Sequence, residues 1–71
     1  MTNFNYAGMS TSGLLQIHAP IQRCMDIDDK SQAPLWLKPY GVRYYPDWRE
    51  HSDAIESELI QRGVPFSPVR W

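Results

Sequence analysis

One stretch of this sequence carries consistent signals for the start, the period and the end of a helix, and it constrains what the rest can fold into. Asp47 is a suitable N-cap, because its carboxylate can accept hydrogen bonds from the unpaired amides of a first turn, and Glu50 completes a capping box. Gly63 is the residue type expected just past a helix end. We therefore predict a helix over residues 47–62. A second Asp-x-x-Glu pattern, six residues further on, would allow a later start, but we favour the earlier one.

The predicted helix is amphipathic. At about 100° per residue, one stripe holds Trp48, Ser52, Ile55 and Leu59, whereas the remaining positions are mostly charged or polar. We expect Trp48, Ile55 and Leu59 in the core. Ile60 lies well off this stripe, so either the C-terminal segment folds over it or a partner contacts it.

The segments before the helix favour short strands. Within residues 14–21, apolar side chains at 15, 17, 19 and 21 alternate with polar residues and Pro20, which is the period of a half-buried strand, and Pro20 would place that strand at a sheet edge or bend it. Residues 24–27 and 42–45 predict two further short strands. The predicted fold class is therefore α+β, with one principal amphipathic helix packed on a small sheet of three or four short strands.

The two ends of the chain differ in composition. Residues 1–12 are mostly small and polar and predict a flexible lead, although Phe4 and Tyr6 alternate as they would in an edge strand. Residues 64–71 predict an extended, proline-containing segment. This segment begins like the stretch before the helix, since glycine, valine, an aromatic residue and proline recur at matching places in 41–46 and 63–68. Two parallel strands flanking one helix would follow from that likeness.

The length of 71 residues predicts a single small domain that buries only about 60% of its unfolded surface. The lone Cys24 excludes an internal disulfide, so a partner protein or a homodimer would supply the missing burial. An unpaired cysteine also fits a reducing compartment. No segment resembles an export signal, and none approaches the roughly 20 apolar residues of a membrane span. We expect a cytoplasmic protein that does not interact with a membrane.

The formal net charge is −1, with basic and acidic residues interleaved, which argues against non-specific binding to duplex nucleic acid. Aromatic residues make up 13% of the chain and concentrate after position 35. Large rings fill small cores, and they also form the centres of protein interfaces. The residues that we expect at a partner-binding surface are Trp36, Tyr40, Tyr44, Ile60 and Trp71.

No pattern in the sequence indicates catalysis. There is no glycine-rich phosphate loop and no Cys-x-x-Cys, and His18 and His51 are too far apart in sequence for a local metal site. We expect no catalytic residue, no metal and no cofactor. The leading hypothesis is a non-enzymatic protein-binding module that acts as a small regulator or inhibitor of another protein, as many short phage and mobile-element proteins do. The alternative is a single-stranded nucleic-acid-binding protein that uses Arg43, Arg49 and the neighbouring aromatic rings.

The C-terminal segment allows a further interpretation. Pro65, Pro68 and Arg70 have the spacing of ligands for polyproline-recognising grooves. A proline-rich edge strand is the simpler interpretation, and we favour it at this point. An exposed strand edge would also offer unpaired backbone groups to a partner chain.

Overall fold

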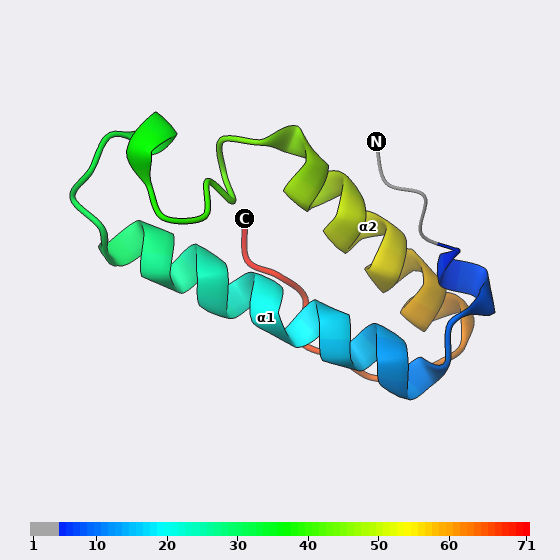
Figure 1. The fold of residues 1–71 in the computed structure, drawn as a ribbon. Helices are drawn as coiled ribbons and strands as arrows, with labels where there is room; N and C mark the ends of the chain where they lie inside the picture. Colours follow the sequence, from blue (N-terminus) through cyan, green and yellow to red (C-terminus); the bar gives the residue numbers. More distant parts are fainter. Residues whose placement is uncertain (1–4) are drawn as a thin grey trace.

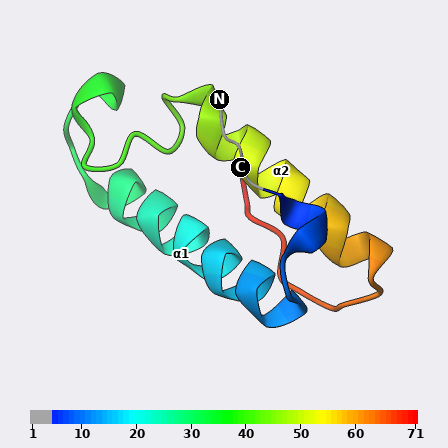
Figure 2. The same cartoon turned by 45° about the vertical axis from the view of Figure 1, so that its right-hand side comes forward.

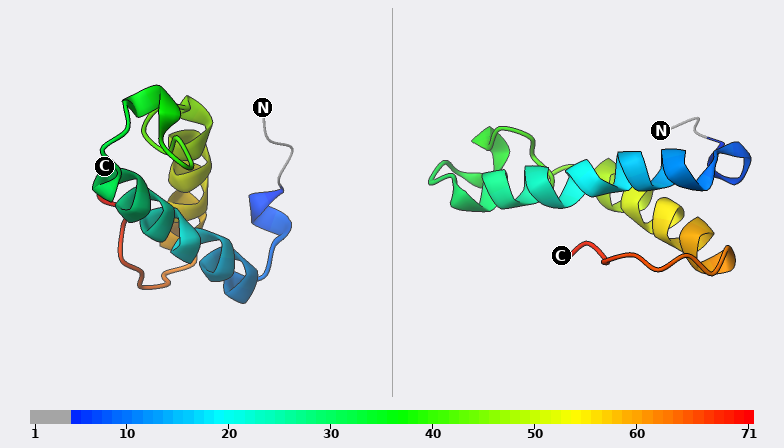
Figure 3. Two further views of the ribbon diagram at one scale, coloured as in Figure 1. Left: turned by 60° about the vertical axis from the view of Figure 1, so that its left-hand side comes forward. Right: turned by 90° about the horizontal axis from the view of Figure 1, so that it is seen from below.

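The computed structural model describes residues 5–71, and two long helices account for more than half of them. The elements in chain order are η1 (Tyr6–Gly8), α1 (Thr11–Lys30), η2 (Leu35–Leu37) and α2 (Pro46–Gln61). Figures 1 and 2 show α1 and α2 running in roughly opposite directions, joined at one end by a long connecting loop, residues 31–45. The C-terminal tail, residues 64–71, returns along one side of the helix pair (Figure 3).

The predicted α+β fold class is wrong, because residues 5–71 contain helices and irregular segments but no strand. The strands expected at 14–21 and 24–27 both lie within α1. The buried side chains of α1 are Leu14, His18, Ile21, Met25 and Asp28. Their spacing of four, three, four and three residues is that of one helical face, so the apparent alternation did not reflect the buried positions.

Pro20, which was expected to place a strand at a sheet edge or to bend it, lies in the middle of α1. A proline inside a helix lacks the amide that would bond the carbonyl four residues earlier, which costs about 3 kcal/mol. Leu14, Ile21 and Met25 are almost completely buried on the opposite helix. Each such side chain contributes about 1.5 to 3 kcal/mol, so the burial of this face outweighs the cost of the proline.

The helix expected over 47–62 is confirmed as α2, but its N-cap was predicted wrongly. Pro46 occupies the first turn, where its missing amide costs nothing, and the N-cap residue is Tyr45, whose side chain makes no capping hydrogen bond. Asp47 therefore lies inside the first turn, and its carboxylate interacts favourably with the helix dipole instead of capping the helix. The capping box with Glu50 does not explain where α2 begins.

The end of α2 follows the sequence signal. Gly63 adopts a left-handed conformation with φ of 69°. The amide of Gly63 donates to the carbonyl of Ile60 at 3.0 Å, and that of Val64 donates to the carbonyl of Leu59 at 3.0 Å. These two bonds form a Schellman motif, which satisfies the last carbonyls of the helix and turns the chain toward the tail.

The core lies between the two helices and is closed by one side chain from the connecting loop and one from the tail. Its buried apolar members are Leu14, Ile21, Met25, Val42, Ile55, Leu59 and Val69. Of the predicted core residues, Ile55 and Leu59 are fully buried and Trp48 packs against the cluster while remaining half-buried. Ser52 is also fully buried, as expected for a residue on the same stripe.

The expectations for the chain ends also need correction. Residues 5–12 contain η1 and the start of α1, so Tyr6 does not lie in an edge strand. The side chain of Ser10 caps α1 by accepting a hydrogen bond from the amide of Gly13 at 3.0 Å. Phe4 lies outside the described residues. The parallel strands expected at 41–46 and 63–68 do not form, and what the two segments share is a glycine with positive φ.

Candidate docking surface

The connecting loop exposes three consecutive apolar side chains at η2. Leu35 is 40% exposed, and Trp36 and Leu37 are each 65% exposed. We call these three residues the apolar tip. Surface apolar residues are common singly, whereas here three consecutive residues, one of them a tryptophan, are all exposed.

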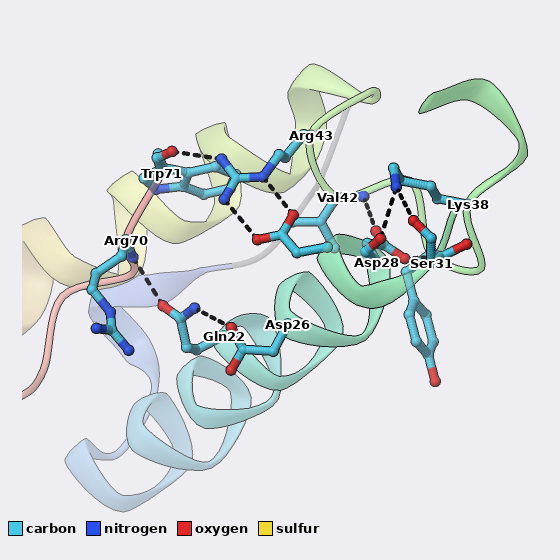
Figure 4. A network of polar contacts seen from close by, with 11 residues as sticks. Gln22, Asp26, Asp28, Ser31, Lys38, Val42, Arg43, Arg70 and Trp71 are labelled. Atoms are coloured by element: carbon cyan, nitrogen blue, oxygen red, sulfur yellow. Dashed lines mark hydrogen bonds and ion pairs between the residues drawn. The ribbon is translucent and has the colours of Figure 1, made fainter. Parts of the chain in front are cut away.

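The loop is fixed to the end of α1 by Lys38. Its ammonium group donates to the carbonyls of Asp28 and Ser31, both at 2.8 Å. These carbonyls belong to the last turn and the C-cap of α1, where the helix dipole favours a cation, and the Asp28 carbonyl also accepts the amide of Ser31 at 3.1 Å. Lys38 therefore closes the helix end with a charge from a distant position in the loop (Figure 4).

A buried carboxylate makes the second attachment. Asp28 is 1% exposed, on the buried face of α1. Its Oδ1 accepts the amide of Tyr40 at 2.9 Å, and its Oδ2 accepts the amide of Val42 at 2.8 Å. Gly41, between these two residues, has φ of 64°. Glycine populates this conformation freely, and here it lets the amides on both sides of it reach the same carboxylate.

A third attachment lies at the loop's far side. Arg43 donates from Nε and one terminal nitrogen to the two oxygens of Asp29, at 2.9 and 3.0 Å, and from its other terminal nitrogen to the carbonyl of Trp71. The hydrogen bond from Arg43 holds the pKa of Asp29 below its usual value, and the same bond raises the pKa of Arg43. Figure 4 shows this guanidinium between the loop and the tail, so one side chain joins α1, the loop and the tail.

The structure brings three of the five predicted contact residues into one segment. Trp36, Tyr40 and Tyr44 all lie in the connecting loop and are exposed. Ile60 is 68% exposed, but it lies in the last turn of α2, about 20 Å along the helix from the loop. The tail does not cover it. Trp71 is half-buried against the core, and its indole nitrogen is buried with no hydrogen-bond partner among residues 5–71.

The two arginines of the nucleic-acid alternative are both engaged within the chain. Arg43 is paired with Asp29, and Arg49 stacks over the ring of Trp71 at 5.5 Å from its centre. Tyr44 and Tyr45 pack edge to face with their ring centres 5.0 Å apart, so the two rings do not form parallel surfaces for successive bases.

The two histidines pair with different elements. His18 Nε2 lies 2.7 Å from Glu56 Oε2, and the same carboxylate oxygen accepts the amide of Val69 at 2.9 Å. This contact joins α1, α2 and the tail. His51 Nδ1 lies 2.6 Å from the Tyr6 hydroxyl, and burial lowers the pKa of His51. Across the described chain, no group of three or more His, Cys, Asp or Glu side chains is arranged to hold a metal ion.

Sequence reasoning missed Leu35 and Leu37 as surface residues and Asp28 as the residue that fixes the loop. The two leucines belong to an apolar run between Pro34 and Pro39, which is too short to form a helix that buries them all. That proline-bounded run was the available signal. Asp28 carried no local signal, because its partners are twelve and fourteen residues away.

No helix within residues 5–71 is long and apolar enough to cross a membrane. Comparison with known proteins gives no further assignment. No family model, curated protein or solved structure matches this chain.

Proposed function

We propose that this chain is a non-enzymatic protein-binding module, a small regulator or inhibitor of another protein, and that the apolar tip is its docking surface. One observation carries the proposal: Leu35, Trp36 and Leu37 are exposed on a loop that the buried Asp28 carboxylate holds in place. A fixed apolar loop loses little conformational entropy on binding, which favours affinity.

The length of the loop supports this assignment. Antiparallel helices are usually joined by about 2 to 8 residues, whereas the loop here spans residues 31–45. Only Val42 from this loop enters the apolar core. A segment that is longer than the connection needs, held by buried polar contacts and apolar on its outside, is typical of a binding loop.

The chemistry of the tip indicates the partner's surface. Tryptophan is enriched among interface residues that dominate binding energy, and it buries up to about 250 Å². Covering the exposed 65% of Trp36 would contribute about 2 to 4 kcal/mol. The partner is therefore a protein with an apolar pocket for the indole ring, bordered by apolar surface for Leu35 and Leu37. The unpaired Cys24 supports a cytoplasmic location.

A photo-crosslinking amino acid placed at position 36 tests the proposal in the source cells. Position 60 is the matched control, because Ile60 is as exposed as Trp36 but lies at the other end of α2. We expect one protein to crosslink at 36 and not at 60. Capture of a second copy of the chain at position 36 would show that the partner is another copy and that the protein forms a homodimer. Capture of nucleic acid or lipid at 36, or equal protein capture at both positions, would refute this docking surface.

A further inference from the structure

Between Val64 and Trp71, which also pack against the core cluster, the tail has two inward-facing side chains three residues apart. Phe66 and Val69 face inward, where Val69 is buried and Phe66 packs against the core cluster. Pro65 and Pro68, one residue earlier in each case, are both exposed. A separation of three residues puts two side chains on the same face of a polyproline II helix, which has three residues per turn.

Local chemistry favours this backbone conformation. A proline ring fixes φ near −65°, and the residue before a proline is biased toward extended conformations. Residues 64, 65, 67 and 68 are all constrained in this way. The interpretation of the tail as an edge strand is wrong, since residues 5–71 form no sheet that the tail could join.

Two hydrogen bonds to the helices hold the tail in place. The amide of Val69 donates to Glu56 of α2 at 2.9 Å, and the amide of Arg70 donates to Gln22 of α1 at 2.9 Å. Both bonds use the backbone, so the outward side chains remain available. The guanidinium of Arg70 is exposed and forms no ion pair with any residue in 5–71 (Figure 4).

An open groove runs beside the tail and gives a partner access to it. The groove has a volume of about 830 Å³. Its walls are formed by Leu15, Ala19 and Gln22 of α1 and by Phe66, Pro68 and Arg70 of the tail. A partner that binds the prolines therefore has space for its own side chains on the side of the tail that faces α1.

We propose that the tail is a second docking segment, which displays Pro65, Pro68 and Arg70 to a protein groove that recognises polyproline II ligands. Such grooves are lined by aromatic rings that receive the prolines. The groove that fits this tail also carries a carboxylate, because the Arg70 guanidinium has no ion-pair partner among residues 5–71 and pairs best with a bidentate acceptor. This inference does not depend on the apolar tip, since the two surfaces share no residue.

The test is a calorimetric titration of the full chain with a purified SH3 domain selected for Pro-x-x-Pro-x-Arg ligands. A free peptide of residues 63–71 is titrated in parallel. We expect the full chain to bind at least as tightly as the peptide, because the tail is already ordered. Failure of both to bind, or binding by the peptide and not by the full chain, would overturn the proposal.

Four variants locate the contact. Loss of a charged hydrogen-bonding partner weakens binding by about tenfold or more, which is the expected effect of Arg70→Ala, and Pro68→Ala should weaken binding several-fold. The matched controls are Arg23→Ala and Pro34→Ala, which change exposed residues of the same types outside the tail. If the controls weaken binding as much as the tail variants do, the tail is not the contact.

Discussion

Replacing Asp28 by Asn tests whether the buried carboxylate fixes the connecting loop. The side chain of asparagine has the same shape, but it offers one acceptor oxygen and turns an NH2 group toward the second amide. Either Tyr40 or Val42 then has a buried donor facing another donor. Losing a hydrogen bond to a charged group costs about 1.5 to 3 kcal/mol, and the unsatisfied donor adds to that, so we expect about 2 to 4 kcal/mol in all.

That loss is a large part of the total free energy of unfolding. A chain of this length has a free energy of unfolding of about 4 to 10 kcal/mol, and each kcal/mol shifts the melting temperature by about 4 to 8 °C. The variant should remain folded at low temperature and melt roughly 10 to 30 °C below the original chain. Amide hydrogen exchange should show lost protection at Tyr40 and Val42, while the core of α1 keeps its protection.

The neighbouring carboxylate provides the control. Asp29→Asn removes the same charge from an exposed side chain whose partner, Arg43, is also partly exposed. Exposed ion pairs contribute little to stability, so this variant should melt close to the original chain. The reasoning is refuted if Asp28→Asn and Asp29→Asn have the same melting temperature and if the amides of Tyr40 and Val42 in Asp28→Asn remain protected from hydrogen exchange.

Three further predictions concern stability. Ser52→Ala should raise the free energy of unfolding by about 1 kcal/mol, because the buried hydroxyl has no hydrogen-bond partner within residues 5–71, and a loss of stability in urea would contradict this. Gly41→Ala should destabilise by about 1 to 2 kcal/mol, since φ is 64° and a Cβ would lie 2.7 Å from the Tyr45 ring; unchanged stability would show that this conformation is not required. Burial lowers the pKa of His51 below 6.5, because the folded state favours the neutral imidazole. The stability that this neutral ring supports is therefore complete above pH 6.5 and is lost as the pH falls through the folded pKa. Denaturation at pH 7 and pH 5 should therefore show a smaller loss for His51→Gln than for the original chain, and equal losses would exclude this role.

Helix α2 was predictable because local signals and the buried face agree along it. The stripe of Ser52, Ile55 and Leu59 is buried as expected, and Gly63 ends the helix. The N-cap was misplaced by two residues, at Asp47 instead of Tyr45, since Asp47 and Pro46 both suit the beginning of a helix and only the first-turn geometry distinguishes their positions.

Helix α1 was missed because a local rule and the global packing conflict. Pro20 and the alternation of residues 14–21 both argue against a helix on local grounds. The free energy gained by burying Leu14, Ile21 and Met25 against α2 depends on contacts with residues more than twenty positions away. Nothing within a short window of sequence reports that gain.

The candidate surface was predicted in part. Trp36, Tyr40 and Tyr44 were expected at a contact surface because aromatic residues exceed what a small core needs, and all three are exposed in one loop. Their role in binding remains a prediction. The attachment of the loop by Asp28 was not predictable, since a carboxylate followed by a second one reads as solvated surface until the helical face is known.

The most direct test of the docking surface compares Trp36→Ala with Ile60→Ala against the purified partner that crosslinks at position 36. Both side chains are about two-thirds exposed, so neither variant should change the melting temperature appreciably. We predict that Trp36→Ala weakens binding by about 2 to 4 kcal/mol, or roughly 30-fold to several hundredfold, while Ile60→Ala leaves the Kd unchanged. Equal Kd values for Trp36→Ala and the original chain, at equal stability, would contradict the account.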